Sequence, residues 1–135
     1  MSAAARRAKP KQTEASPLVV VNAFFDAIES GDFERAEERL SVEHFTYEGP
    51  IERFDNAGAF ILSISRIGAI LEGLKRRRMF VDGNEVCAIL TYETTVEAIK
   101  TTRIAHWIRV EKGRITRIES FFDARGYAGM FDSEP

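Results

Sequence analysis

The fold is decided by residues 101–123, TTRIAHWIRVEKGRITRIESFFD, in which two alternating runs meet at a tight turn. Apolar residues such as Ile104 and Ile108 fall on one side of the first run. Because successive side chains of a strand point to opposite faces, each run is typical of a β-strand. Residues 112–113, Lys-Gly, provide the turn between them. The stretch therefore predicts two long antiparallel strands, 101–111 and 114–123.

The same alternation extends upstream of this hairpin. From residue 76 onward the apolar period changes from helical to alternating, and residues 82–84, Asp-Gly-Asn, mark a turn before another long strand at 85–96. Strands of this length twist and coil, so the sheet should be concave on one side. We expect this side to wrap a helix and a cavity.

The amino-terminal half predicts helices instead. Ser16 is suited to cap a helix that Gly31 ends, and a second short helix follows from Asp32. A short strand is expected at residues 44–48, and a long amphipathic helix at 56–74. Helices followed by a meander of strands predict an α+β fold, with a curved mixed, mainly antiparallel sheet wrapped around a long helix and an amino-terminal helical hairpin.

Length and composition predict one domain. The chain has 135 residues, of which 44% are hydrophobic and 30% charged, as in an ordinary globular protein. Residues 1–15 lack apolar periodicity and are expected to form a disordered tail before a single domain at 16–135. The single cysteine, Cys87, lies in a run that predicts a buried strand position and suits a reducing cytoplasm.

Several partners are not expected. A formal net charge of −2 gives no electrostatic reason for nucleic-acid binding, and the apolar run 18–25 is too short to span a membrane. His44 and His106 are the only histidines, so no metal is expected, and the chain has no phosphate loop that would predict a nucleotide cofactor. The basic run 75–78 is interpreted as a solvated helix end.

The order of elements, together with the stretches Lys112-Gly113-Arg114-Ile115 and Phe121-Phe122-Asp123-Ala124-Arg125, resembles the nuclear transport factor 2-like superfamily. The branch that looks closest contains the SnoaL-like polyketide cyclases and ketosteroid isomerases. The resemblance covers about residues 17 to 131. It implies a cystatin-like cone, a mostly apolar pocket between the concave sheet face and the helices, and a homodimer paired through the outer sheet face.

Strand alternation predicts which side chains line this pocket. His106 shares a face with isoleucines of its strand, and Tyr92 falls on the more apolar face of the strand before it. The expected lining residues are Phe24, Tyr92, Leu90, Ile104, Ile108, Ile118, Ser120 and Phe122.

The resemblance also implies two catalytic candidates. The position of the isomerases' oxyanion acid corresponds to His106, which can still donate a hydrogen bond. The position of their base corresponds to Glu48 or, one residue later, to Gly49, and the position of their helix-one tyrosine corresponds to Phe24. The structural alternative is a solvated Glu48 and a hydrogen-bonded core histidine at 106.

Two functions remain open at this stage. One is a cofactor-independent isomerase, cyclase or dehydratase that uses Glu48 and His106 for acid–base chemistry on a hydrophobic carbonyl compound. The other is a non-catalytic ligand-binding or protein-interaction module. Epoxide hydrolysis by the two-aspartate triad of limonene-epoxide-hydrolase-like relatives is not expected, because Ser120 stands where the last-strand aspartate would be.

Overall fold

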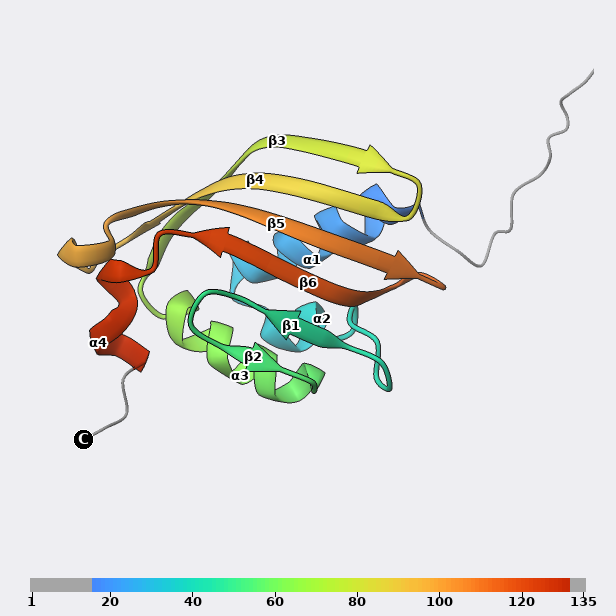
Figure 1. The fold of residues 1–135 in the computed structure, drawn as a ribbon, viewed down its shortest axis with the longest axis horizontal. Coiled ribbons are helices and arrows are strands. Elements are labelled where there is room, and N and C mark those ends of the chain that lie inside the picture. The colour runs from blue at the N-terminus through green and yellow to red at the C-terminus, as the bar shows by residue number, and fades with distance from the viewer. Residues whose placement is uncertain (1–15, 132–135) are drawn as a thin grey trace, which may run out of the picture.

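The computed structural model describes residues 16–131 and has an α+β fold (Figure 1). The tail predicted at residues 1–15 lies outside the described residues. The elements are, in chain order, α1 (Pro17–Ser30), α2 (Phe33–Glu37), β1 (Thr46–Glu48), β2 (Arg53–Phe54), α3 (Ala57–Gly68), β3 (Leu71–Asp82), β4 (Glu85–Thr94), η1 (Glu97–Ile99), β5 (Thr101–Glu111), β6 (Arg114–Phe122), η2 (Arg125–Tyr127) and α4 (Ala128–Phe131).

One six-stranded sheet runs in the order β2-β1-β6-β5-β4-β3. Every neighbouring pair is antiparallel except β1 and β6, which are parallel, so the predicted mixed, mainly antiparallel sheet is confirmed. Figure 1 shows the four long strands side by side in one bent layer, with α1 lying against it. Register shifts at two places in β3 and one between β5 and β6 mark bulges, which add to the bend.

The predicted helix ends of the amino-terminal hairpin are confirmed. The hydroxyl of Ser16 accepts a hydrogen bond from the Val19 N–H at 3.2 Å, which satisfies a free donor at the start of α1. Gly31 ends this helix in the left-handed conformation at φ 78°, where a side chain would be strained. The carboxylate of Asp32 then accepts from the Arg35 N–H at 3.1 Å and caps α2.

The third helix ends earlier than the predicted residue 74. It stops at Gly68, and β3 already begins at Leu71 because this segment pairs with β4. The short stretch 70–74, Ile-Leu-Glu-Gly-Leu, fits the end of a helix and the start of a strand equally well, so periodicity alone cannot separate the two.

The basic run 75–78 therefore lies on a strand, and its interpretation as a helix end was wrong. Arg76 reaches across to α1, where its guanidinium donates to the side chains of Asn22 at 2.8 Å, Asp26 at 2.6 Å and Glu29 at 3.1 Å. This residue joins the edge strand to the first helix.

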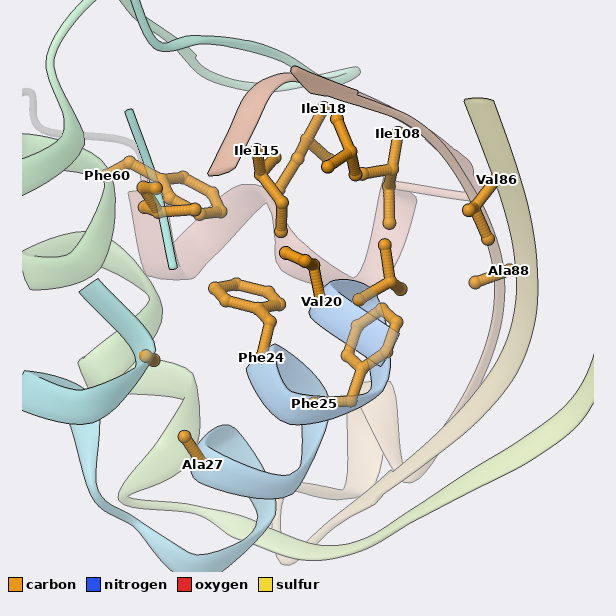
Figure 2. Packing of buried hydrophobic residues seen from close by; sticks show 14 of the residues in the cluster. Val20, Phe24, Phe25, Ala27, Phe60, Val86, Ala88, Ile108, Ile115 and Ile118 are labelled. Carbon is orange, nitrogen blue, oxygen red and sulfur yellow. The ribbon is translucent and has the colours of Figure 1, made fainter. Parts of the chain in front are cut away.

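The hydrophobic core fills the space between α1 and the concave face of the sheet. Figure 2 shows Val20 and Phe25 of α1 directed toward Ile108 of β5. These side chains are almost completely buried, as is Leu90 of β4. Burial of such side chains contributes about 1.5 to 3 kcal/mol each, so this contact holds helix and sheet together.

The outer face of the sheet is much more exposed. Phe80, Trp107 and Phe121 are 48%, 43% and 51% exposed there. Cys87 also faces this side and is only half-buried, which corrects the predicted buried position; strand alternation buries its neighbours Val86 and Ala88 instead. Within residues 16–131, no helix is both long and apolar enough to cross a lipid bilayer.

Candidate active site

A cavity of about 100 Å³ lies between the concave sheet face and helices α1 and α3. Most of the predicted lining residues contact it, namely Phe24, Tyr92, Ile104, Ile108, Ile118 and Phe122, and so does His106. Leu90 and Ser120 do not reach it. Leu90 is packed in the hydrophobic core, and Ser120 lies behind His106, to which it is bonded.

The polar groups of the cavity wall are few. The chain has three tyrosines, Tyr47, Tyr92 and Tyr127, and all of them line the cavity. The other polar lining side chains are those of Glu52, Ser63 and His106, and the remaining wall is apolar. The wall therefore combines apolar packing with hydroxyl, imidazole and carboxylate groups that can act on a bound molecule.

His106 is held between two hydroxyl groups. Its Nδ1 lies 2.6 Å from Oγ of Ser120, and its Nε2 lies 3.1 Å from the hydroxyl of Tyr92. The side chain is buried, and burial lowers the pKa of His106 to about 4 because the charged form loses its hydration. At neutral pH the ring is uncharged, with one nitrogen donating and the other accepting.

The phenols of Tyr47 and Tyr92 remain protonated. Burial raises the pKa of Tyr47, although a hydrogen bond with Ser120 lowers it in part and the nearby carboxylate of Glu52 raises it again. Burial likewise raises the pKa of Tyr92, and the neighbouring phenols of Tyr47 and Tyr127 raise it further. Both groups are therefore neutral hydrogen-bond donors over the ordinary pH range.

Glu52 brings a carboxylate to the cavity, a role that the sequence interpretation missed. It follows the turn after β1, where its carbonyl accepts from the Gly49 N–H at 2.9 Å. Ser63 of α3 donates a hydrogen bond to Glu52 Oε1 at 2.7 Å and fixes this carboxylate. The Gly49-Pro50 turn, which sends the chain back toward the preceding strand, was the one signal in the sequence that could have pointed to it.

Glu48, the predicted base, does not line this cavity. Its neighbour Tyr47 faces inward, and because strand residues alternate, Glu48 faces the other side of β1. The Glu48 side chain is 45% exposed, lies 3.9 Å from Arg117 and borders a separate surface groove. Gly49 carries no side chain, so neither predicted base position supplies a carboxylate to the cavity.

Two further side-chain groups have local roles. Asp123 accepts hydrogen bonds from Arg125 at the end of β6, and this pair lowers the pKa of Asp123 to about 2. His44 is exposed beside Glu43. Residues 16–131 contain no cluster of three or more histidine, cysteine or acidic side chains that could hold a metal ion, and the expectation that none is needed stays a prediction.

Comparison with family models decides the family. The model of the SnoaL-like domain matches residues 21–118. The chain belongs to the SnoaL-like domain family. A search of the curated proteins finds no match to this SnoaL-like domain.

Solved structures place the domain in the NTF2-like fold. It is similar to an NTF2-like protein of unknown function from Cytophaga hutchinsonii, with 25% identity, a TM-score of 0.74 and coverage of 90% of this chain and 100% of that one. An LEH-like epoxide hydrolase from M. tuberculosis shows 20% identity, a TM-score of 0.69 and coverage of 85% and 88%. A candidate polyketide cyclase from Sinorhizobium meliloti shows 17% identity, a TM-score of 0.65 and coverage of 76% and 93%. The last two likenesses concern the fold alone.

Proposed function

We propose that this SnoaL-like domain binds a small hydrophobic carbonyl compound and catalyses a proton transfer on it, such as isomerisation, cyclisation or dehydration, without a cofactor. The observation that carries the proposal is the gathering of all three tyrosines of the chain on one largely apolar cavity. Apolar walls with a few convergent polar groups are typical of small-molecule sites.

In this proposal Glu52 is the base in place of Glu48. Its carboxylate takes a proton from the carbon beside the carbonyl group, and Ser63 holds it in position. A phenol of the cavity wall, from Tyr47 or Tyr92, donates to the carbonyl oxygen as negative charge develops there. Return of the proton from Glu52 to a different carbon completes an isomerisation with no net loss of atoms.

The size of the cavity limits the ligand. Engineered protein cavities of about 150 Å³ hold benzene. The cavity here measures about 100 Å³, which is smaller, so a single six-membered ring is the upper size, and it enters only with a small outward movement of the lining side chains. We therefore choose cyclohexanone as the probe.

Deuterium exchange at the carbon atoms beside the carbonyl of cyclohexanone, followed by NMR in D2O, tests the catalytic proposal. Glu52→Gln should lower the protein-catalysed exchange by about 100-fold or more, the usual scale of general-base catalysis. Glu48→Gln is the matched control and should retain the wild-type rate, because Glu48 lies outside the cavity. Exchange no faster with protein than with buffer, or a loss confined to Glu48→Gln, would contradict the proposal.

A second candidate is a non-catalytic binding module. It is favoured by Phe24, which lines the cavity without a hydroxyl where the resemblance implies a catalytic tyrosine in the isomerases. Such a module would bind cyclohexanone, seen as shifts of cavity-residue resonances, but would leave its deuterium exchange at the rate of the buffer. The same NMR samples therefore separate the two functions.

We further propose that the domain acts as a homodimer in the cytoplasm. The exposed aromatic rings of Phe80, Trp107 and Phe121 on the outer sheet face support dimerisation, because apolar surface of this kind is commonly covered by a partner. Cys87 is a free thiol, which suits a reducing compartment.

A further inference from the structure

Glu52 is the one acidic residue on the cavity wall, and its carboxylate has no cationic partner in the part of the chain that the structure describes. Within residues 16–131, no lysine or arginine side chain lines the cavity, and none forms an ion pair with Glu52. The ring of His106 is uncharged at neutral pH. The lining therefore holds a carboxylate and no positive charge.

The basic residue that is next to Glu52 in the chain does not neutralise this carboxylate. Arg53 borders the separate surface groove, together with Glu48 and Arg117. Among the described residues, the hydrogen-bond donor to the Glu52 carboxylate is the neutral hydroxyl of Ser63, which lies 2.7 Å from Oε1. The second oxygen atom of Glu52 is thus left to water or to a ligand.

Burial of Glu52 is incomplete, and this decides which ligand it favours. The residue is half-buried, so water still hydrates its charge when the cavity holds no ligand. A ligand that enters displaces part of this water, and an uncharged ligand gives the carboxylate little in return. A cation instead replaces the lost hydration with an ion pair, which strengthens as water leaves.

Aromatic rings lie beside the carboxylate. Phe60 comes three residues before Ser63 on α3, so the two side chains share one face of this helix. The ring of Tyr47 stacks on that of Phe60 with 4.6 Å between the centroids, and both rings line the cavity. Aromatic faces attract cations, so these rings add to the attraction of the Glu52 carboxylate.

We propose that the cavity also binds small apolar ammonium compounds, with the ammonium group paired to Glu52 and the hydrocarbon part in the apolar interior. This inference rests on the same cavity as the proposed function but does not require catalysis. An ammonium group at Glu52 would occupy the carboxylate that the proposed reaction uses as its base. Such compounds should therefore inhibit the deuterium exchange of cyclohexanone in competition with it.

Paired probes of equal size test the charge preference. Cyclohexylammonium and cyclohexanone each carry one polar substituent on a six-membered ring, and they differ chiefly in charge. The methyl resonance of Ile64, which lines the cavity next to Ser63, reports the binding of either compound. The wild type should bind cyclohexylammonium about 5- to 20-fold more tightly, the scale of one charged hydrogen bond. Equal or weaker binding of the ammonium compound would overturn the proposal.

Glu52→Gln tests which group is responsible. This variant should lose the preference for cyclohexylammonium but still bind cyclohexanone within about 2-fold of the wild type, which also shows that it is folded. Glu48→Gln is the matched control and should keep the preference, because Glu48 borders the separate groove. A preference that survives in Glu52→Gln would overturn the assignment to this carboxylate.

Salt provides a test that needs no variant. Raising the ionic strength from about 0.01 M to about 1 M should weaken the binding of cyclohexylammonium several-fold relative to cyclohexanone, because dissolved ions screen the attraction between charges. Affinities that keep the same ratio at both ionic strengths would contradict an ion pair with the half-buried Glu52.

The two probes also separate this inference from the proposed function. Binding of cyclohexanone alone would overturn the inference and leave the proposed function in place. Binding of cyclohexylammonium alone would support the inference and contradict the carbonyl ligand. Binding of neither compound would contradict both.

Discussion

His106 should make the stability of the domain fall as the solution becomes mildly acidic. Burial lowers the pKa of this ring from the usual 6.5 to about 4, so the unfolded chain binds a proton more readily than the folded one. The stability that the neutral His106 ring contributes is fully present above pH 6.5 and is lost as the pH falls toward 4. At about 1.4 kcal/mol per pH unit, it amounts to about 2 kcal/mol between neutral pH and about pH 5.

Urea unfolding followed by the fluorescence of Trp107, the single tryptophan, measures this loss. His106→Gln keeps a polar side chain that does not titrate. Between neutral pH and about pH 5, the free energy of unfolding of this variant should therefore fall by about 2 kcal/mol less than that of the wild type. His44→Gln is the matched control, because it makes the same substitution at an exposed histidine and leaves His106 in place, so the loss of stability assigned to His106 should persist. Equal pH dependence in the wild type and His106→Gln would refute the argument.

Three further substitutions test the fold and the outer surface. Leu90→Ala should lower the free energy of unfolding by about 2 to 5 kcal/mol in urea titrations, whereas Val42→Ala, at a residue 82% exposed, should have almost no effect; similar losses would contradict the described core. Arg76→Met should lower the free energy of unfolding by about 1 kcal/mol, and by less at high salt, because it removes the ion pairs to α1. An unchanged unfolding midpoint would mean that these ion pairs contribute nothing to stability. Phe121→Lys should convert a dimer into a monomer in analytical ultracentrifugation without changing the far-ultraviolet circular dichroism, and a monomeric wild type would contradict the proposed dimer.

Local patterns predicted those parts of the fold that local chemistry determines. The caps at Ser16 and Asp32 depend on hydrogen bonds to residues three positions away, and both are present. Alternation along β5 correctly placed His106 on the buried face. The end of α3 could not be predicted in the same way, because pairing of Leu71 with Thr94 in a distant strand decides it.

The candidate base shows why part of the site could not be predicted. Strand β1 has only three residues, and its parallel pairing with β6 sets which of them faces inward. That pairing joins Tyr47 to Ile118, far away in the sequence, and turns Glu48 outward. Glu52 reaches the cavity through a turn whose shape depends on this pairing, so no periodic pattern identifies it.

NMR spectra of isoleucine δ1-methyl groups during titration with cyclohexanone test most directly whether the cavity is a ligand site. Cavity-lining methyl groups, such as those of Ile64, Ile104 and Ile118, should shift together and saturate. Ile115, buried in the core, and Ile89, on the outer face, should not shift. Saturable shifts centred on Ile89, or none at the cavity residues, would contradict a ligand site at this position.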